Sequence, residues 1–208
     1  MASIWDLFKK IETEREAPKP ITHLVVGLGN PGKDYEMTRH NAGFMALDRL
    51  AETYPSAVTR ARFRALTGET EIAGKRVLLM KPQTYMNHSG EAVRDAADFY
   101  KIPPENVLVI CDDVSFDVGR LRIRRKGSDG GQKGLQNIIY QLRSDAFPRI
   151  RLGVGKKPEG GDLTSWVLGR IPEAERKTFS EVLDRAAEAV PLILNGEIDR
   201  AMSECNGL

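Results

Sequence analysis

The chain contains few cysteines and few histidines. Among its 208 residues, the cysteines are Cys111 and Cys205, and the histidines are His23, His40 and His88. Two distant cysteines without a CxxC spacing exclude a disulfide framework and a zinc ribbon, and they fit a reducing compartment such as the cytosol. The histidines show no HExxH or comparable ligand spacing, so we expect no metal site.

Long apolar runs are also absent. The N-terminal sequence MASIWDLFKKIETEREAPKP carries several acidic residues and is not a secretion signal, and no later stretch is long enough to span a membrane. We therefore expect a cytoplasmic protein without a membrane partner. Four apolar residues near the N-terminus follow the i, i+3, i+4, i+7 spacing of a short amphipathic helix, namely Ile4, Leu7, Phe8 and Ile11. We expect residues 1–20 to form this extension and a linker, and residues 21–208 to form one domain.

A large excess of one charge is missing as well. The chain has 31 Lys and Arg residues against 29 Asp and Glu residues, which gives a net charge of +2. The net charge therefore does not identify a nucleic-acid-binding protein, and only a local cluster of basic residues could indicate one. The 41% of hydrophobic and 29% of charged residues are typical of a globular domain.

Short apolar runs alternate with helical patterns along the chain. Apolar or alternating runs predict strands at 23–29, 107–113, 119–127 and 150–155, and two further strands around a turn within 60–80. Helical spacing predicts helices at 41–54, 89–100, 135–142 and 173–194, with Asn41 as the N-cap of the first. Strands interleaved with helices predict an α/β fold, a single-domain three-layer sandwich with a mixed, mostly parallel β-sheet flanked by helices.

A glycine-rich turn follows the first predicted strand. The sequence Gly27-Leu28-Gly29-Asn30-Pro31-Gly32 satisfies GxGxxG. As a dinucleotide site it should open a helix and be followed, after about 20 residues, by an acidic residue that ends a second strand. Pro31 stands where that helix would begin, and Asp48 lies within a predicted helix, so we expect no NAD. The turn still lies at a strand's C-terminal end, where α/β folds bind ligands.

This turn continues as GLGNPGKDYEMTRHNAG, and four further blocks follow in the chain. They are KPQTYMNHSGEAV, VLVICDDVSFDVGRLRIRRKGSDGGQKGLQNII, the segment from Phe147 to Pro158, and LTSWVLGRIP. In this order, over about residues 22–200, the chain resembles the bacterial-type peptidyl-tRNA hydrolases. The resemblance implies an enzyme that hydrolyses the ester bond of peptidyl-tRNA released prematurely from ribosomes, without a cofactor.

The resemblance also implies roles for three polar residues. The family's general base falls on His40, and a neutral imidazole is the usual side chain for taking a proton from water near pH 7. Its orienting aspartate falls on Asp112, which ends a predicted strand and could reach His40 across neighbouring strand ends; the adjacent Asp113 is the rival. Asn30 is expected to recognise the N-blocked peptide group as the third member of the catalytic set.

Four further residues are expected to contact substrate by resemblance. Asn87 should line the catalytic crevice, while Tyr35 and Tyr85 should lie near the 3′ end of the tRNA unless they are core tyrosines. Many family members carry histidine and asparagine where this chain has Gln132 and Lys133. Because a cation at a helix start needs an offsetting partner, we expect Lys133 to point at the substrate.

A basic strand offers a second kind of contact. Along GRLRIRRKG, Arg122 and Arg124 should share one face while Leu121 and Ile123 face the core. By resemblance these arginines surround the tRNA acceptor stem, with Arg124 and Arg149 holding its terminal phosphate. The expected partner is thus the acceptor stem and 3′ end of peptidyl-tRNA, and we expect a monomer with no obligate protein partner.

One alternative from another functional class is a non-catalytic RNA-binding relative of the same fold. Such a protein needs the basic face but not the general base. The joint presence of Asn30, His40, Asn87 and Asp112 favours the enzyme over this alternative.

Overall fold

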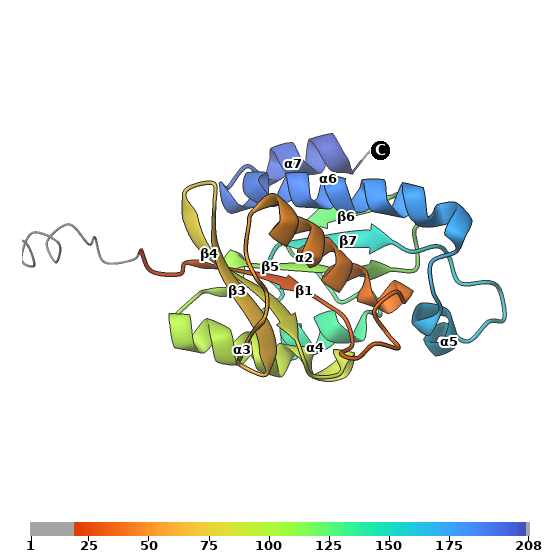
Figure 1. Ribbon diagram of the computed structural model, residues 1–208, viewed down its shortest axis with the longest axis horizontal. Helices are drawn as coiled ribbons and strands as arrows, with labels where there is room; N and C mark the ends of the chain where they lie inside the picture. Colours follow the sequence, from red (N-terminus) through yellow and green to blue (C-terminus); the bar gives the residue numbers. More distant parts are fainter. Residues whose placement is uncertain (1–18, 207–208) are drawn as a thin grey trace, which may run out of the picture.

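A seven-stranded sheet runs through the computed structural model, which describes residues 19–206 (Figure 1). Its strands are β1 (His23–Gly27), β2 (Arg60–Arg62), β3 (Ala65–Ile72), β4 (Lys75–Pro82), β5 (Val107–Asp113), β6 (Leu121–Arg124) and β7 (Arg149–Gly153). Their order across the sheet is β2-β3-β4-β1-β5-β7-β6. The four central strands are parallel neighbours, and antiparallel pairs flank them on both sides. The predicted mixed, mostly parallel sheet is confirmed.

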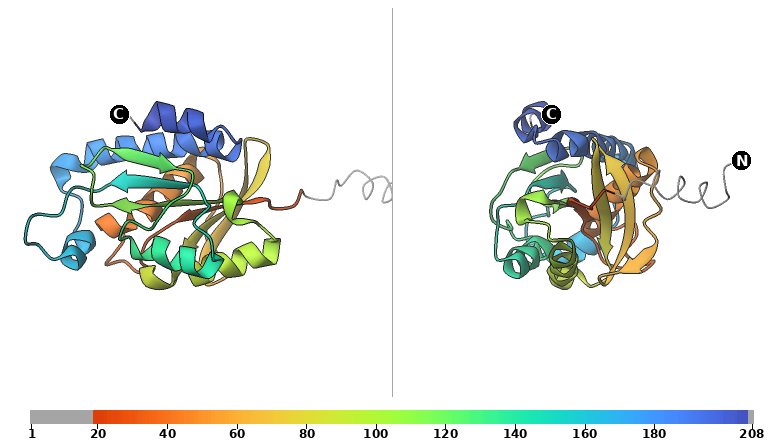
Figure 2. Two further views of the ribbon diagram at one scale, coloured as in Figure 1. Left: turned by 180° about the vertical axis from the view of Figure 1, so that it is seen from behind. Right: turned by 90° about the vertical axis from the view of Figure 1, so that its left-hand side faces the viewer.

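Helices cover both faces of this sheet (Figures 1 and 2). One face carries α2 (Ala42–Thr53), α6 (Arg176–Leu194) and α7 (Ile198–Cys205), and the other carries α3 (Ser89–Tyr100) and α4 (Lys133–Leu142). Each face has its own apolar core, and alternate residues of β5 supply both, with Leu108 and Ile110 on the first and Val109 and Cys111 on the second. The predicted three-layer sandwich is therefore confirmed.

The central strand β5 is buried along its whole length, from Val107 to Asp113. This burial explains its continuous apolar sequence, since a parallel strand covered on both faces does not alternate. The two carboxylates at its C-terminal end, Asp112 and Asp113, are buried as well.

Two glycines bring α2 against the sheet. A Cβ atom on Gly43 would overlap backbone atoms of Ile110 and Leu28, and one on Gly27 would overlap the backbone of Gly43. Because neither position has room for a side chain, the start of α2 lies directly on the end of β1 and on the middle of β5. This close approach places the residues just before α2 beside the C-terminal end of β5.

Some elements differ from those predicted. Residues 60–82 form three strands rather than two, and the helix expected from residue 173 begins with a 3-10 turn, Glu173–Glu175, before α6. The short helix α5 (Leu163–Leu168) was not predicted as a helix. The predicted N-terminal helix at Ile4–Ile11 lies outside the described residues.

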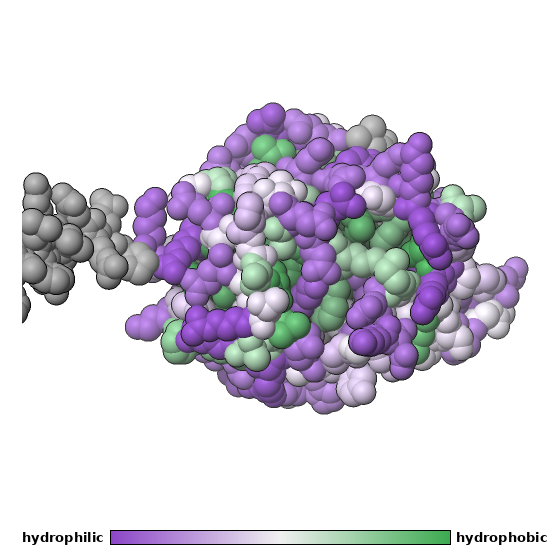
Figure 3. Space-filling view, viewed as in Figure 1, coloured by the Kyte–Doolittle hydropathy of each residue, from purple (hydrophilic) through white to green (hydrophobic). Residues whose placement is uncertain are grey.

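The described surface is mainly hydrophilic on the face drawn in Figure 3, with apolar residues in separate patches. No helix within residues 19–206 combines the length and the apolar character needed to cross a membrane.

Candidate active site

A cleft of about 430 Å³ lies at the C-terminal ends of β1 and β5. Its walls also come from two 3-10 turns, η1 (Arg39–Asn41) and η2 (Met86–His88), and from the start of α4 and from α5. The lining residues include Asn30, His40, Tyr85, Met86, Asn87, Asp112, Asp113, Gln132, Lys133 and Arg151. The glycine-rich turn therefore opens onto a cavity, as its place at a strand end predicted.

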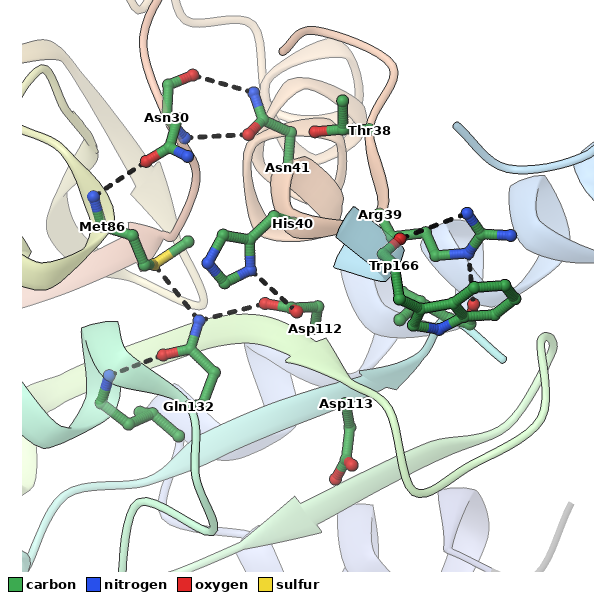
Figure 4. Close-up of polar contacts among 12 residues, drawn as sticks. Asn30, Thr38, Arg39, His40, Asn41, Met86, Asp112, Asp113, Gln132 and Trp166 are labelled. Atoms are coloured by element: carbon green, nitrogen blue, oxygen red, sulfur yellow. Dashed lines mark hydrogen bonds and ion pairs between the residues drawn. The ribbon is translucent and has the colours of Figure 1, made fainter. Parts of the chain in front are cut away.

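His40 and Asp112 form a hydrogen-bonded pair in this cleft (Figure 4). The His40 Nδ1 atom lies 2.9 Å from Asp112 Oδ2, and the side chains of His40 and Asp112 are 14% and 3% exposed. A carboxylate accepts hydrogen bonds, so Nδ1 carries the proton and Nε2 of the neutral ring keeps its lone pair. The predicted contact between β5 and the turn before α2 is confirmed.

Asp113, the rival carboxylate, points elsewhere. Its Oδ2 atom lies 2.8 Å from Arg151 Nε as an ion pair rather than a well-directed hydrogen bond. Its Oδ1 atom accepts a hydrogen bond from the backbone N–H of Ser115 at 2.9 Å. Successive residues of a strand face opposite sides, so only one of the two aspartates turns towards His40.

Asn30 is held by three hydrogen bonds. Its backbone N–H donates to Asn41 Oδ1 at 2.8 Å, its carbonyl accepts from Asn41 Nδ2 at 3.0 Å, and its side-chain Oδ1 accepts from the Met86 N–H at 2.8 Å. The Nδ2 group of Asn30 has no hydrogen-bond partner among the described residues, and Asn30 lines the cleft. Asn30 therefore offers the cleft a fixed amide donor.

Asn41 occupies the N-cap position of α2, as predicted, but its side chain makes no capping hydrogen bond. Its amide is occupied by the backbone of Asn30, so it ties the glycine-rich turn to the start of α2. The tie fixes the two segments that carry Asn30 and His40 relative to each other.

Three of the four predicted substrate contacts line the cleft, and one does not. Asn87, Lys133 and the 61% exposed Tyr85 lie on its wall, so Tyr85 is not a core tyrosine. Tyr35 is half-buried and lies outside the lining, in the turn that leads to Thr38.

The basic strand β6 is oriented as predicted. Leu121 and Ile123 are buried, while Arg122 and Arg124 are exposed. The guanidinium of Arg122 lies 4.7 Å from the ring centroid of Phe116, which holds it over the surface. Arg122 is paired across the sheet with Arg151 of β7.

Arg149 is buried, and this contradicts its predicted contact with phosphate. It is 1% exposed, and its guanidinium donates to the carbonyls of Gly127, Asp145 and Phe147. Burial lowers its pKa from the ordinary value, as expected for a cation removed from water. Arg149 therefore fastens two turns to the start of β7 and does not reach the cleft.

Arg151, two residues later, does line the cleft. A Cβ atom on Gly130 would overlap its guanidinium, so the glycine provides the room in which this group lies. Arg149 and Arg151 are two residues apart on β7 and so share a face, and alternation alone cannot separate them.

The remaining wall of the cleft is α5, which contributes Leu163, Thr164, Val167 and Leu168. Arg39 anchors this helix: its guanidinium carbon lies 3.8 Å from the ring centroid of Trp166, and its Nε donates to the carbonyl of Val154 at 3.1 Å. The backbone N–H of Arg39 also donates to the carbonyl of Gly169 at 2.9 Å. Arg39, the residue next to His40, thus holds the α5 wall of the cleft in place.

Across residues 19–206, no three His, Cys, Asp or Glu side chains are grouped so that they could hold a metal ion.

Comparison with known proteins places these features in one family. The family model described as peptidyl-tRNA hydrolase matches residues 24–208. A peptidyl-tRNA hydrolase of Caldanaerobacter subterraneus subsp. tengcongensis is 54% identical over 185 residues, covering 89% of this chain and 100% of that protein. One from Lachnospira eligens is 50% identical with the same coverage.

A solved structure agrees with the sequence comparisons. The crystal structure of peptidyl-tRNA hydrolase from Acinetobacter baumannii superposes with a TM-score of 0.85 at 34% identity, over 92% of this chain and 98% of that one. The chain therefore belongs to the peptidyl-tRNA hydrolase family.

Proposed function

We propose that this protein hydrolyses the ester bond of peptidyl-tRNA released prematurely from ribosomes and yields free tRNA and peptide. The observation that carries the proposal is the His40–Asp112 pair in a cleft that also presents the Asn30 amide. Membership of the family supports the same activity.

In the proposed reaction, His40 is the general base. Its Nε2 takes a proton from a water molecule, whose oxygen attacks the ester carbonyl carbon. Asp112 accepts the Nδ1 hydrogen bond and stabilises the resulting imidazolium. When the tetrahedral intermediate collapses, the bond from carbon to the ribose oxygen breaks, and His40 returns the proton to that oxygen.

Amide groups would stabilise the charge that develops on the carbonyl oxygen. Asn30 has its Oδ1 occupied by the Met86 N–H, so its Nδ2 is the group that remains for the substrate. A donor held in advance needs no reorganisation during the reaction. We assign to Asn30 the N-blocked peptide group or this oxyanion, and to Asn87 a contact in the same crevice.

Other residues of the cleft would position the tRNA. We assign Tyr85 and Lys133 to its 3′ end, since both lie exposed on the cleft wall, and we keep Tyr35 as a more distant contact. For the acceptor stem we propose Arg122 and Arg124, with Arg151 in place of Arg149. Phosphate contacts of this kind position a nucleic acid without reading its sequence.

Hydrolysis of an N-acetyl-aminoacyl-tRNA tests the proposal. Replacement of the base in His40→Ala should lower kcat by about 10²–10⁴ and leave tRNA binding intact. His88→Ala is the matched control, because His88 is exposed on η2 and pairs with Glu91 outside the cleft. A wild-type protein that binds tRNA without hydrolysing it would instead favour the non-catalytic RNA-binding alternative.

Salt dependence tests the basic residues. Binding should weaken as salt rises, because phosphate contacts release counterions. The double variant Arg122→Gln/Arg124→Gln should flatten this dependence and raise KM with little change in kcat. Arg76→Gln, on β4 and paired with Glu69, is a control that removes an arginine elsewhere on the sheet.

The remaining expectations are part of the same proposal: a monomer in the cytoplasm that needs neither a metal nor a nucleotide cofactor. Activity should survive dialysis against EDTA, and the protein should elute as a monomer in gel filtration.

A further inference from the structure

Gln132 is buried at the bottom of the cleft and contacts the catalytic pair. It is 6% exposed, and its Nε2 donates to Asp112 Oδ1 at 3.0 Å (Figure 4). Because His40 binds the other oxygen of the same carboxylate, both oxygens of Asp112 are held. The carboxylate therefore cannot rotate away from His40 without breaking a buried hydrogen bond.

The orientation of the Gln132 amide is fixed by its surroundings. Gln132 is the N-cap of α4, and its Oε1 accepts the backbone N–H of Leu135 at 2.8 Å. If the amide were flipped, its NH₂ group would face the Leu135 N–H and its oxygen would face the Asp112 carboxylate. Neither contact could then be a hydrogen bond, since one would join two donors and the other two acceptors. Helix α4 thus determines which end of the amide Asp112 meets.

We propose that Gln132 is a positioning residue that sets the direction of the hydrogen bonds through Asp112 to His40. The chain of donors and acceptors begins at the Leu135 N–H, passes through the Gln132 amide, and ends at the Nδ1–H of His40. This direction keeps the proton on Nδ1 and leaves Nε2 free to act as base. The inference rests on the proposed function, since it assigns a role within that reaction.

The amide of Gln132 also reaches the substrate-binding side of the cleft. Its Nε2 lies 3.2 Å from the Met86 sulfur, and the Met86 backbone N–H holds Asn30. Gln132 therefore contacts the residues that support both the base and the amide donor. Removing it should lower turnover rather than substrate affinity, because the surface that faces the tRNA stays in place.

The variant Asp112→Asn tests the direction of these hydrogen bonds. The new amide at position 112 must turn its oxygen towards the Gln132 N–H, so its NH₂ group faces His40. The ring then has to accept at Nδ1 and carry its proton on Nε2, where it cannot take a proton from water. We expect kcat to fall by about 10²–10⁴, as for loss of the general base.

A second substitution should restore the direction. In Asp112→Asn/Gln132→Glu, the new carboxylate at position 132 accepts from the NH₂ group at position 112 and still accepts the Leu135 N–H. The oxygen at position 112 then faces the Nδ1–H of His40 again. The pair keeps one negative charge, and a carboxylate is favourable at a helix N-terminus.

The control is Asp112→Asn/Gln136→Glu. Gln136 is exposed one turn further along α4, so this variant adds the same charge to the same helix without touching position 112. The other charged groups of the cleft are Asp113 with its partner Arg151, and Lys133, while α5 and η2 contribute uncharged residues to the wall. All of these are unchanged in both double variants.

We expect Asp112→Asn/Gln132→Glu to exceed Asp112→Asn in kcat by at least about tenfold, the size of one restored buried hydrogen bond, with KM unchanged. The control should stay at the level of Asp112→Asn. Equal kcat in both double variants would overturn the inference.

Gln132→Leu gives a second, independent readout. It should lower kcat by about 10–100-fold with KM unchanged, the range found for partners that orient metal-ligating histidines. A folded Gln132→Leu protein with wild-type kcat would also overturn the inference. The proposed function fails separately, if wild-type protein releases no more peptide than His40→Ala.

Discussion

The anchor between Arg39 and α5 leads to a prediction about one wall of the cleft. Arg39 is 6% exposed, and its guanidinium stacks on Trp166 and donates to the Val154 carbonyl. Its contact with the Trp166 carbonyl is longer, at 3.4 Å. Arg39→Met keeps most of the length of the side chain but removes the cation and its donors.

The cost of this change can be worked from the contacts. A hydrogen bond from a charged donor contributes about 1.5–3 kcal/mol, and a desolvated cation over an aromatic ring about 2 kcal/mol. Burial lowers the pKa of Arg39, which shows that the buried charge carries a desolvation cost that methionine avoids. Because the Val154 carbonyl lies outside α5, only the stacking on Trp166 attaches the helix directly. We therefore expect α5 to lose about 2 kcal/mol of its attachment, counting the long contact as negligible.

Hydrogen exchange of the α5 amides measures this loss. A change of about 2 kcal/mol corresponds to exchange about 30-fold faster, up to the limit set by local opening in the wild type. KM for peptidyl-tRNA should rise as well, since α5 supplies Leu163 and Val167 to the cleft.

Arg49→Met is the control, because Arg49 joins α2 to α6 through Asp184 and does not contact α5. Unchanged α5 exchange in Arg39→Met, or equally faster exchange in the control, would refute the anchoring role.

Three further predictions concern the scaffold. Gly43→Ala should lower the free energy of unfolding by about 1–3 kcal/mol in urea denaturation, because its Cβ meets backbone that cannot move aside; wild-type stability would contradict this. Burial, and to a smaller extent the charge of Lys75, lowers the pKa of His23 in the folded protein, so the unfolded chain takes up the proton first. The free energy of unfolding should therefore decline as pH falls through the ordinary histidine pKa, and His23→Gln should reduce that decline. Cys205, which is partly exposed, should react with a thiol reagent in the native protein, whereas Cys111, which is fully buried, should react only on unfolding.

Much of the fold could be predicted because the spacing of apolar residues along the sequence follows which side chains are buried. The continuous apolar run at 107–113 and the alternation at Leu121–Arg124 reappear as a central strand and an edge strand. The three strands at 60–82 were merged into two, since the turn at Phe63 and Arg64 is formed by residues with positive φ rather than by glycine. Such a turn has no glycine or proline to mark it.

The pairing of His40 with a carboxylate at the end of β5 could also be predicted, because a strand end and a glycine-rich turn meet at the same edge of a parallel sheet. The choice of Asp112 over Asp113 came from the family resemblance. The role of Gln132 could not be predicted, since glutamine is not a usual N-cap. Its side-chain contacts lie 20 residues away in Asp112, 46 residues away in Met86 and 3 residues away in Leu135. The α5 wall was missed because a six-residue helix shows little periodicity.

The two arginines of β7 show where reasoning from sequence ends. Arg149 and Arg151 belong to the same strand, lie on the same face and carry the same charge. They differ in their distance along the strand: Arg149 pairs with Val109 in the middle of the sheet, and Arg151 pairs with Cys111, next to the strand end where the cleft opens. One step of two residues, about 7 Å along a strand, separates a cation enclosed by backbone carbonyls from one that faces the cleft. Periodicity indicates the face on which a side chain lies. Whether the side chain is enclosed or faces the cleft depends on turns such as 127–132, whose position the periodicity does not predict.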